Sequence, residues 1–103
     1  MDAVTPEAAL DKLAEWRDGL AWVECIVGSH STSFGYRVVG RVADFDDCFL
    51  IWSSRDRCAA TLPCVLFQRS DLLEIDDAGT LHLRFPHADV QISEIGTKDA
   101  GHA

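Results

Sequence analysis

The side chains most suited to chemistry in this chain are four cysteines and four histidines. Cys58 and Cys64 are separated by five residues, whereas zinc ligands are typically separated by two to four, and no histidine pair follows at ligand spacing. Arg55 and Arg57 precede Cys58 and would favour its thiolate form, but the sequence places no general base beside it. We therefore predict no metal ligand, no cofactor and no catalytic residue, and we leave open whether the chain is an enzyme.

Three arginines form a second group of candidates. Arg37 and Arg41 fall on the same face of a predicted strand, and we expect Arg84, from a later strand, to lie near them. Together they would form a small basic patch, or they would pair with glutamates on neighbouring strands. We favour pairing. A deep pocket lined by these arginines and His82 would instead favour a ligand-binding or enzymatic domain.

Two tryptophans form the third group. Trp22 and Ile26 alternate with Val23 and Cys25, so the two pairs lie on opposite faces of one predicted strand. If the valine faces the core, Trp22 must be covered either by a helix or by a partner. Aromatic surface of this kind is typical of protein interfaces, and Trp52 would add to it. The candidate binding residues are therefore Trp22, Trp52, Arg37, Arg41 and Arg84.

Composition limits the partners of the chain. It has 103 residues and a formal net charge of −8, which disfavours phosphate backbones and anionic lipid. No apolar run approaches the roughly 18 residues of a membrane span. The first residues resemble no signal peptide, so we expect a cytoplasmic protein with free thiols. We predict a single globular domain over residues 1–95 and a frayed tail over residues 96–103.

An amphipathic helix is predicted near the N-terminus. Thr5 would be its N-cap and Pro6 its first helical residue, since proline has no backbone N–H to leave unpaired. Apolar residues then recur every three or four positions, and Gly19 fits the C′ position that ends a helix. The stripe consists of Ala9, Leu13, Trp16 and Leu20.

Strands are predicted over the remainder of the chain. Residues 34–53 form a hairpin at its centre, and Gly40 within the first strand indicates a bend, a bulge or a close backbone approach. Pro63 cannot donate a ladder hydrogen bond, so it places the apolar run of residues 61–67 at a sheet edge or at the beginning of a strand. The other predicted strands cover residues 20–28, 72–75, 80–85 and 90–95.

We predict a mainly β, α+β fold, in which an N-terminal helix precedes a strongly bent antiparallel sheet or a small barrel. The alternative is an α+β sheet with the helix packed on one face. Edge-to-edge pairing of strands would make rings or dimers, so we expect a homo-oligomer.

One motif resembles the Sm-like family of small β-barrels. GRVADFD at residues 40–46, followed by CFLIW at residues 48–52, is similar to the family's pattern of glycine, spacer, aromatic-aspartate and apolar strand. The LRF of residues 83–85 resembles the family's Ile-Arg-Gly. The resemblance implies that the barrel is a bent, SH3/Sm-like barrel that assembles through its strand edges. Leu50 stands where the family has a base-reading asparagine, and Cys48 stands where a base-stacking aromatic residue is usual.

The leading functional hypothesis is a non-enzymatic interaction module that self-associates and binds a protein or peptide. The first alternative is an Sm-like nucleic-acid-binding protein, although the negative charge disfavours nucleic acid as a partner. The second alternative is a small ligand-binding or enzymatic domain that uses an Arg/His face.

Overall fold

The computed structural model describes residues 2–30 and 35–96, and these form one antiparallel sheet and two helices. The eight strands lie in the order β1-β6-β7-β8-β2-β3-β4-β5. The prediction of a mainly β fold with an N-terminal helix is confirmed. The strands are β1 (Asp2–Ala3), β2 (Trp22–Ser29), β3 (Gly35–Phe45), β4 (Cys48–Ser53), β5 (Cys58–Pro63), β6 (Leu72–Ile75), β7 (Leu81–Arg84) and β8 (Ala88–Gly96).

Helix α1 (Pro6–Asp18) begins where the sequence predicts. The Thr5 hydroxyl oxygen accepts a hydrogen bond of 3.1 Å from the backbone N–H of Ala8, which satisfies one of the unpaired amides of the first turn. The side chains of the predicted stripe face the core, and Leu13 is completely buried. Leu20 is the exception, because its side chain is 52% exposed.

The end of α1 differs from the prediction by one residue. Gly19 has a right-handed helical conformation, while Leu20 has a φ of +55° and occupies the C′ position. The Leu20 amide donates to Arg17 O at 3.2 Å and the Ala21 amide donates to Trp16 O at 3.0 Å. These two bonds form a Schellman motif around Leu20. Leucine in this conformation is strained, because its Cβ approaches the following carbonyl oxygen.

Strand β2 lies in the interior of the sheet, with β8 on one side and β3 on the other. The predicted alternation is confirmed. Val23 and Cys25 are completely buried, whereas Ile26 on the opposite face is 38% exposed. Strand β2 therefore separates an inner face, which carries the core, from an outer face.

Strand β3 joins two parts of the sheet, because its first half pairs with β2 and its second half with β4. Gly40 lies at the change of partner. A Cβ atom there would be 1.9 Å from the Trp52 carbonyl oxygen, so only glycine lets the two strands approach this closely. The close approach expected at this glycine is thus present. Phe34, the first residue of the predicted hairpin, lies outside the described residues.

The chain after β4 holds two departures from the prediction. The apolar run of residues 61–67 is not one strand, since β5 ends at Pro63 and helix α2 (Leu66–Arg69) follows. Phe67, from this helix, is buried in the core. Strand β5 does lie at a sheet edge, as Pro63 indicates. The second departure is β1, a two-residue strand beside β6 that the sequence analysis missed.

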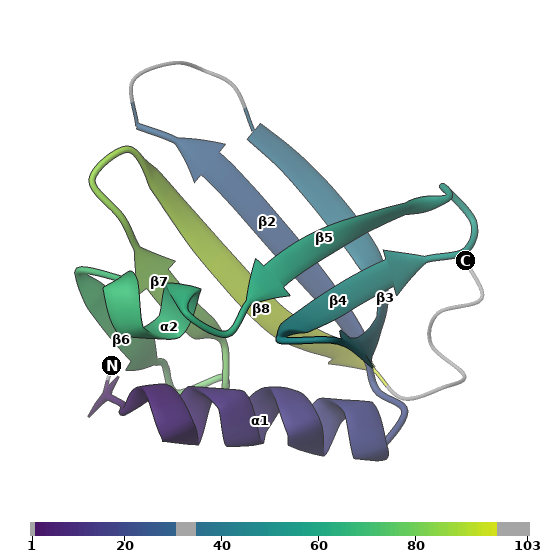
Figure 1. Ribbon diagram of the computed structural model, residues 1–103, viewed down its shortest axis with the longest axis horizontal. Helices are drawn as coiled ribbons and strands as arrows, with labels where there is room; N and C mark the ends of the chain where they lie inside the picture. The colour runs from purple at the N-terminus through teal and green to yellow at the C-terminus, as the bar shows by residue number, and fades with distance from the viewer. Residues whose placement is uncertain (1, 31–34, 97–103) are drawn as a thin grey trace.

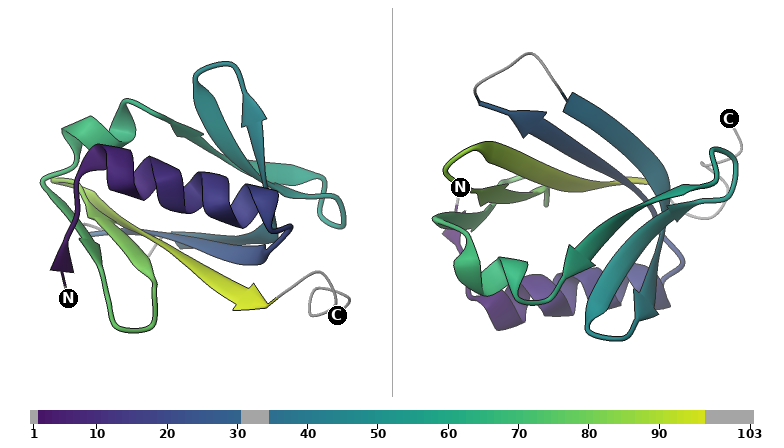
Figure 2. Two further views of the ribbon diagram at one scale, coloured as in Figure 1. Left: turned by 90° about the horizontal axis from the view of Figure 1, so that it is seen from below. Right: turned by 45° about the horizontal axis from the view of Figure 1, so that its top comes forward.

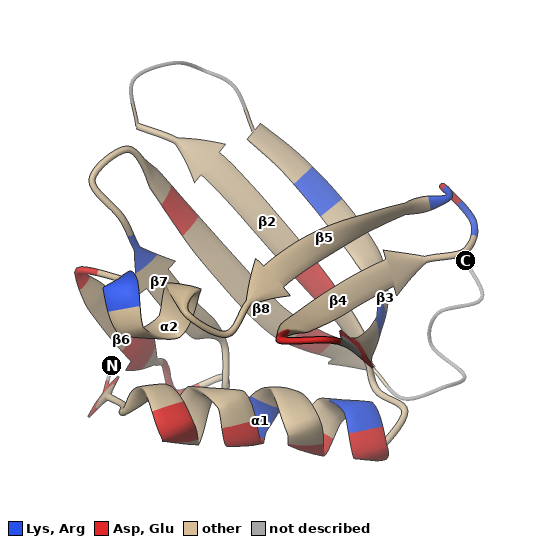
Figure 3. Cartoon of the chain, viewed as in Figure 1, with Lys and Arg blue, Asp and Glu red and all other residues tan. Residues whose placement is uncertain are grey.

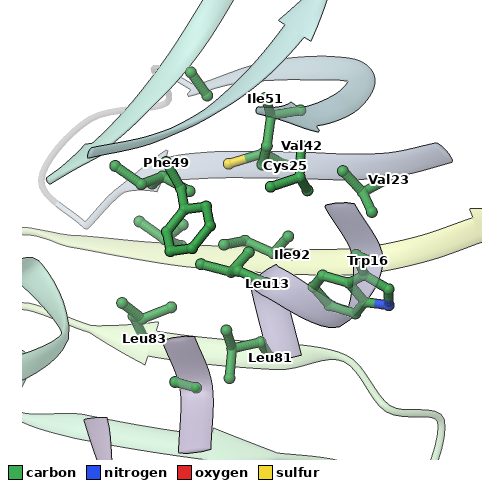
Figure 4. Packing of buried hydrophobic residues seen from close by; sticks show 14 of the residues in the cluster. Leu13, Trp16, Val23, Cys25, Val42, Phe49, Ile51, Leu81, Leu83 and Ile92 are labelled. Atoms are coloured by element: carbon green, nitrogen blue, oxygen red, sulfur yellow. The ribbon is translucent and has the colours of Figure 1, made fainter. Parts of the chain in front are cut away.

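The core lies between the inner face of the sheet and the two helices. Leu13 and Trp16 of α1 point toward Val23, Cys25 and side chains of β7 and β8 (Figure 4). Strand β5 contributes to the same cluster through Leu62. Residues from both ends of the strand order thus share one core.

The sheet is strongly curved, but it is not closed into a barrel. Figure 1 shows β4 and β5 folding over the strands β8 and β2, with α1 along the lower side. The two further views show α1 across the open side of the curved sheet (Figure 2). The helix therefore covers the inner face, as the α+β alternative predicts, and the outer face has no helix on it.

Candidate interaction surface

A row of three large side chains crosses the outer face of β2, β3 and β4. Arg41 pairs directly with Trp22 of β2 on one side and with Trp52 of β4 on the other. The Arg41 guanidinium carbon lies 4.7 Å from the centroid of the Trp22 ring, within the range of a cation–π interaction. Trp52 is 46% exposed. The sequence analysis singled out all three residues, and the strand register brings them together.

Arg41 differs from the other outer-face cations in its hydrogen bonding. Its Nε atom is shielded from solvent and has no hydrogen-bond partner among the described residues. An unsatisfied buried donor costs about 1–3 kcal/mol, and structures usually avoid it. The Arg41 guanidinium group therefore lies against the Trp22 ring and keeps an N–H donor without a partner among the described residues.

Apolar side chains surround this row. Ile26 is exposed on β2, while Val39 on β3 and Leu50 on β4 are partly exposed on the same face. We call this region the tryptophan–arginine surface, and it consists of Trp22, Ile26, Val39, Arg41, Leu50 and Trp52. Because α1 and α2 both pack on the core side, neither helix covers it. Among the described residues, no helix therefore covers the outer face of β2.

Charge is unevenly distributed around this surface. Arg55 and Arg57 lie in the turn between β4 and β5, close in sequence to Trp52, while Asp46 and Asp47 lie in the turn between β3 and β4 (Figure 3). The chain as a whole has a formal charge of −8. Asp56 lies between these two arginines, so this end of the outer face carries only a small local excess of positive charge on an acidic protein.

The three candidate arginines do not form one patch. Arg37 makes an ion pair with Glu24 across β2 and β3, as the preference for pairing predicts. Arg84 lies on β7, which β8 and β2 separate from β3, and its Nε is 3.5 Å from Asp89 Oδ1. Glu74 and Glu94 are not the partners of these arginines in the described ion pairs.

A small pocket of about 220 Å³ lies on the outer face of β7 and β8. It contains His82 and Arg84 but neither Arg37 nor Arg41, so the pocket that would favour an Arg/His ligand site is not formed as envisaged. Its lining residues are Leu72, His82, Leu83, Arg84, Asp89, Val90 and Gln91.

Ionisable groups around this pocket are paired with one another. Asp89 Oδ1 is 2.9 Å from His30 Nε2, although the two atoms lack the alignment of a hydrogen bond. Asp76 Oδ2 is 2.8 Å from His82 Nε2. The hydrogen bond with His82, together with amides of the turn that follows, lowers the pKa of Asp76 below its ordinary value. These contacts stabilise turns and strand ends.

The cysteines are spread over the fold as free thiols. Burial raises the pKa of the Cys25 thiol to about 11, so this side chain acts as a small core hydrophobe. Cys58 is exposed at the beginning of β5. Within residues 2–30 and 35–96, no group of three His, Cys, Asp or Glu side chains is arranged to hold a metal ion.

Comparisons with protein-family models, with curated proteins and with solved structures find no match to this chain. The Sm-like relationship therefore stays a prediction. Among the described helices, none has the length and apolar character needed to cross a membrane.

Proposed function

We propose that this protein is a non-enzymatic interaction module that self-associates and binds a protein or peptide partner. The observation that carries the proposal is the tryptophan–arginine surface, where Trp52 and Ile26 remain exposed because both helices pack on the opposite face. Tryptophan and arginine are enriched at the energetically dominant positions of protein interfaces. Contiguous apolar surface with a polar rim is typical of such interfaces.

The free edge of β5 supports self-association. Among the described strands, β5 pairs with β4 alone, which leaves backbone N–H and C=O groups on its other side available for another strand. Thr61 is exposed on this strand. A second copy adding its own β5 would extend the sheet and would bring two tryptophan–arginine surfaces into one continuous face.

A distant relationship to the Sm-like proteins is part of this proposal. An N-terminal helix before the strands and the glycine bend in β3 support it. The open sheet departs from that family's barrel. RNA binding is the alternative function, and the stacked Trp22 and Arg41 favour it in one respect, because aromatic and guanidinium planes also stack on bases.

Sedimentation velocity over about a hundredfold range of protein concentration tests self-association through mass action. We expect the wild-type chain to shift from monomer to a larger species. Thr61→Lys should oppose the shift, because a lysine on an edge strand disfavours strand pairing. Thr80→Lys, in the turn before β7, is the matched control with the same change of charge and should associate like the wild type.

A strict monomer at every concentration would overturn the self-association proposal. Retention of labelled single-stranded RNA, decreasing steeply with salt, would favour the nucleic-acid alternative. Equal self-association of Thr61→Lys and wild type would move the contact away from β5.

A further inference from the structure

The geometry points to Arg41 as the receptor for a carboxylate on an acidic, otherwise apolar peptide segment of a partner protein. This inference rests on the proposed function and specifies the chemistry of the partner. It begins with the position of Arg41, which lies between two tryptophans by strand register and stacks on one of them at 4.7 Å. Contact with the Trp22 ring restricts the motion of the guanidinium group.

Unlike Arg41, the other described arginines of the strands and of α1 each lie near a carboxylate. Arg37 is paired with Glu24, and Arg17 contacts both Asp18 and Asp44. Arg84 lies near Asp89. Arg41 takes part in none of the ion pairs of the described residues, and its Nε lacks any hydrogen-bond partner there. Glu24, the glutamate next to Trp22 on the same face, is already held by Arg37.

The geometry of the guanidinium group favours a carboxylate as its hydrogen-bond acceptor. Its fork of N–H donors matches the two oxygens of a carboxylate in a bidentate pair, and such charge-assisted bonds are about twice as strong as neutral ones. A guanidinium stacked on an aromatic ring has already lost much of its conformational freedom, so less entropy is lost on binding. Because Nε is shielded from solvent, the carboxylate would bind end-on, through the terminal N–H groups of the fork.

The side chains around Arg41 determine which other groups the ligand should have. Ile26, Val39 and Leu50 flank the row, and Trp52 is exposed beside it, so the groups next to the carboxylate should be aliphatic or aromatic. Among the described strand residues of the outer face, Arg41 is the arginine without a carboxylate partner, and one guanidinium suits one carboxylate. A polyanion such as RNA would extend beyond Arg41 onto a protein with a net charge of −8.

Synthetic octapeptide arrays provide the probe. One array carries a single central Asp among Leu, Phe and Ser residues, and two matched arrays carry Asn or Lys at that position. We expect the wild-type chain to bind the Asp array at least about tenfold more tightly than the Asn array, because a bidentate charged pair replaces a neutral bond. The Lys array should bind most weakly.

Two variants with equal charge separate the proposal from general electrostatics. Arg41→Met keeps the apolar stem and should abolish the preference for Asp over Asn. Arg37→Met removes the same charge from the same face of the same strand, but from a residue already paired with Glu24, and should keep the preference. Arg41→Lys retains the charge without the fork and should keep only part of it. Circular dichroism verifies that each variant is folded.

The outcomes distinguish this inference from the proposed function. If Trp52→Ala weakens binding to every array while Asp and Asn peptides bind equally, the surface is an interface but the carboxylate receptor is wrong. If Arg37→Met abolishes the preference as fully as Arg41→Met, the assignment to Arg41 is wrong. If no array binds at low salt, or if labelled RNA binds in preference to all of them, both the inference and the peptide-binding function are overturned.

Discussion

The inner and outer faces of β2 and β3 differ in how their large side chains are covered. On the inner face, Val23, Cys25 and Val42 are enclosed by α1 and the curled sheet, so every large side chain has a partner within the chain. On the outer face, the Arg41 guanidinium lies over the Trp22 ring while its Nε has no hydrogen-bond partner among the described residues, and Trp52 remains half exposed. The same strands therefore stabilise the fold through their inner face and leave a surface available for binding on their outer face. The comparison predicts that changes on the two faces separate stability from binding.

The largest effect is expected where both faces depend on one residue. Gly40→Ala should destabilise the fold by at least about 3 kcal/mol, because the added Cβ would lie 1.9 Å from Trp52 O and would force β3 and β4 apart. Urea denaturation measures the loss. Gly28→Ala is the control, since nothing lies within 4 Å of the position its methyl group would take, and it should change stability by less than about 0.5 kcal/mol. Similar losses in both variants would contradict the role of Gly40 as the close approach.

A substitution on the inner face should be nearly as costly. Leu13→Ala removes a completely buried side chain from α1 and should cost about 3 kcal/mol, by lost burial and by the cavity left behind. Thermal and urea unfolding measure it. If the variant lost less than about 1 kcal/mol, the helix would not be packed on the core as described.

The end of α1 offers a stabilising change. Leu20→Gly should raise the unfolding free energy by about 1 kcal/mol, because glycine adopts the φ of +55° without the strain that leucine carries there. Gly19→Ala should have little effect, since Gly19 has an ordinary right-handed conformation. The reverse result would restore Gly19 as the left-handed residue that the sequence suggests.

The outer face should respond weakly in stability. Trp52→Ala should cost about 1 kcal/mol or less, despite the size of the side chain, because nearly half of it is already in contact with water. The same variant should lose peptide binding or self-association. A destabilisation as large as that of Leu13→Ala would mean that Trp52 belongs to the core.

The smallest effect is a pH dependence at the other end of the outer face. The pKa of Asp76 is lowered in the folded chain, chiefly by its hydrogen bond with His82, so its ionised form stabilises the fold above the unfolded pKa near 4. That contribution is lost as the pH falls through the folded pKa. Asp76→Asn should therefore be less stable than wild type at pH 7, and the difference should shrink below about pH 4. If the difference in unfolding free energy stayed constant across this pH range, the ionised Asp76 carboxylate would not contribute to stability.

Local signals account for the features that the sequence predicts well. Thr5 and Pro6 specify the start of α1 through backbone chemistry within a few residues, and the alternation around Val23 specifies which face of β2 is buried. The predicted left-handed residue at the helix end is wrong by one position, because glycine is usually chosen for that conformation and here leucine adopts it. The strand predicted over helix α2 is also wrong, since a short apolar run has no clear periodicity.

Long-range pairing accounts for what the sequence does not predict. Arg41 and Trp22 are both expected on an outward face, but only the register between β2 and β3 makes them direct partners. The same limit applies to Arg84, which is expected near Arg37 and lies on a strand that is not its neighbour. Strand order and register are set by the whole sheet, so residues that share a pattern need not share a site.

The short strand β1 sets the direction in which this sheet can grow. By pairing with Ile75 and Glu74 of β6, Asp2 and Ala3 leave only a two-residue strand as the edge at that end of the strand order. A head-to-tail ring or filament needs two complementary edges, whereas two copies joined by β5 to β5 around a twofold axis need one. An assembly built through β5 would thus terminate at a pair.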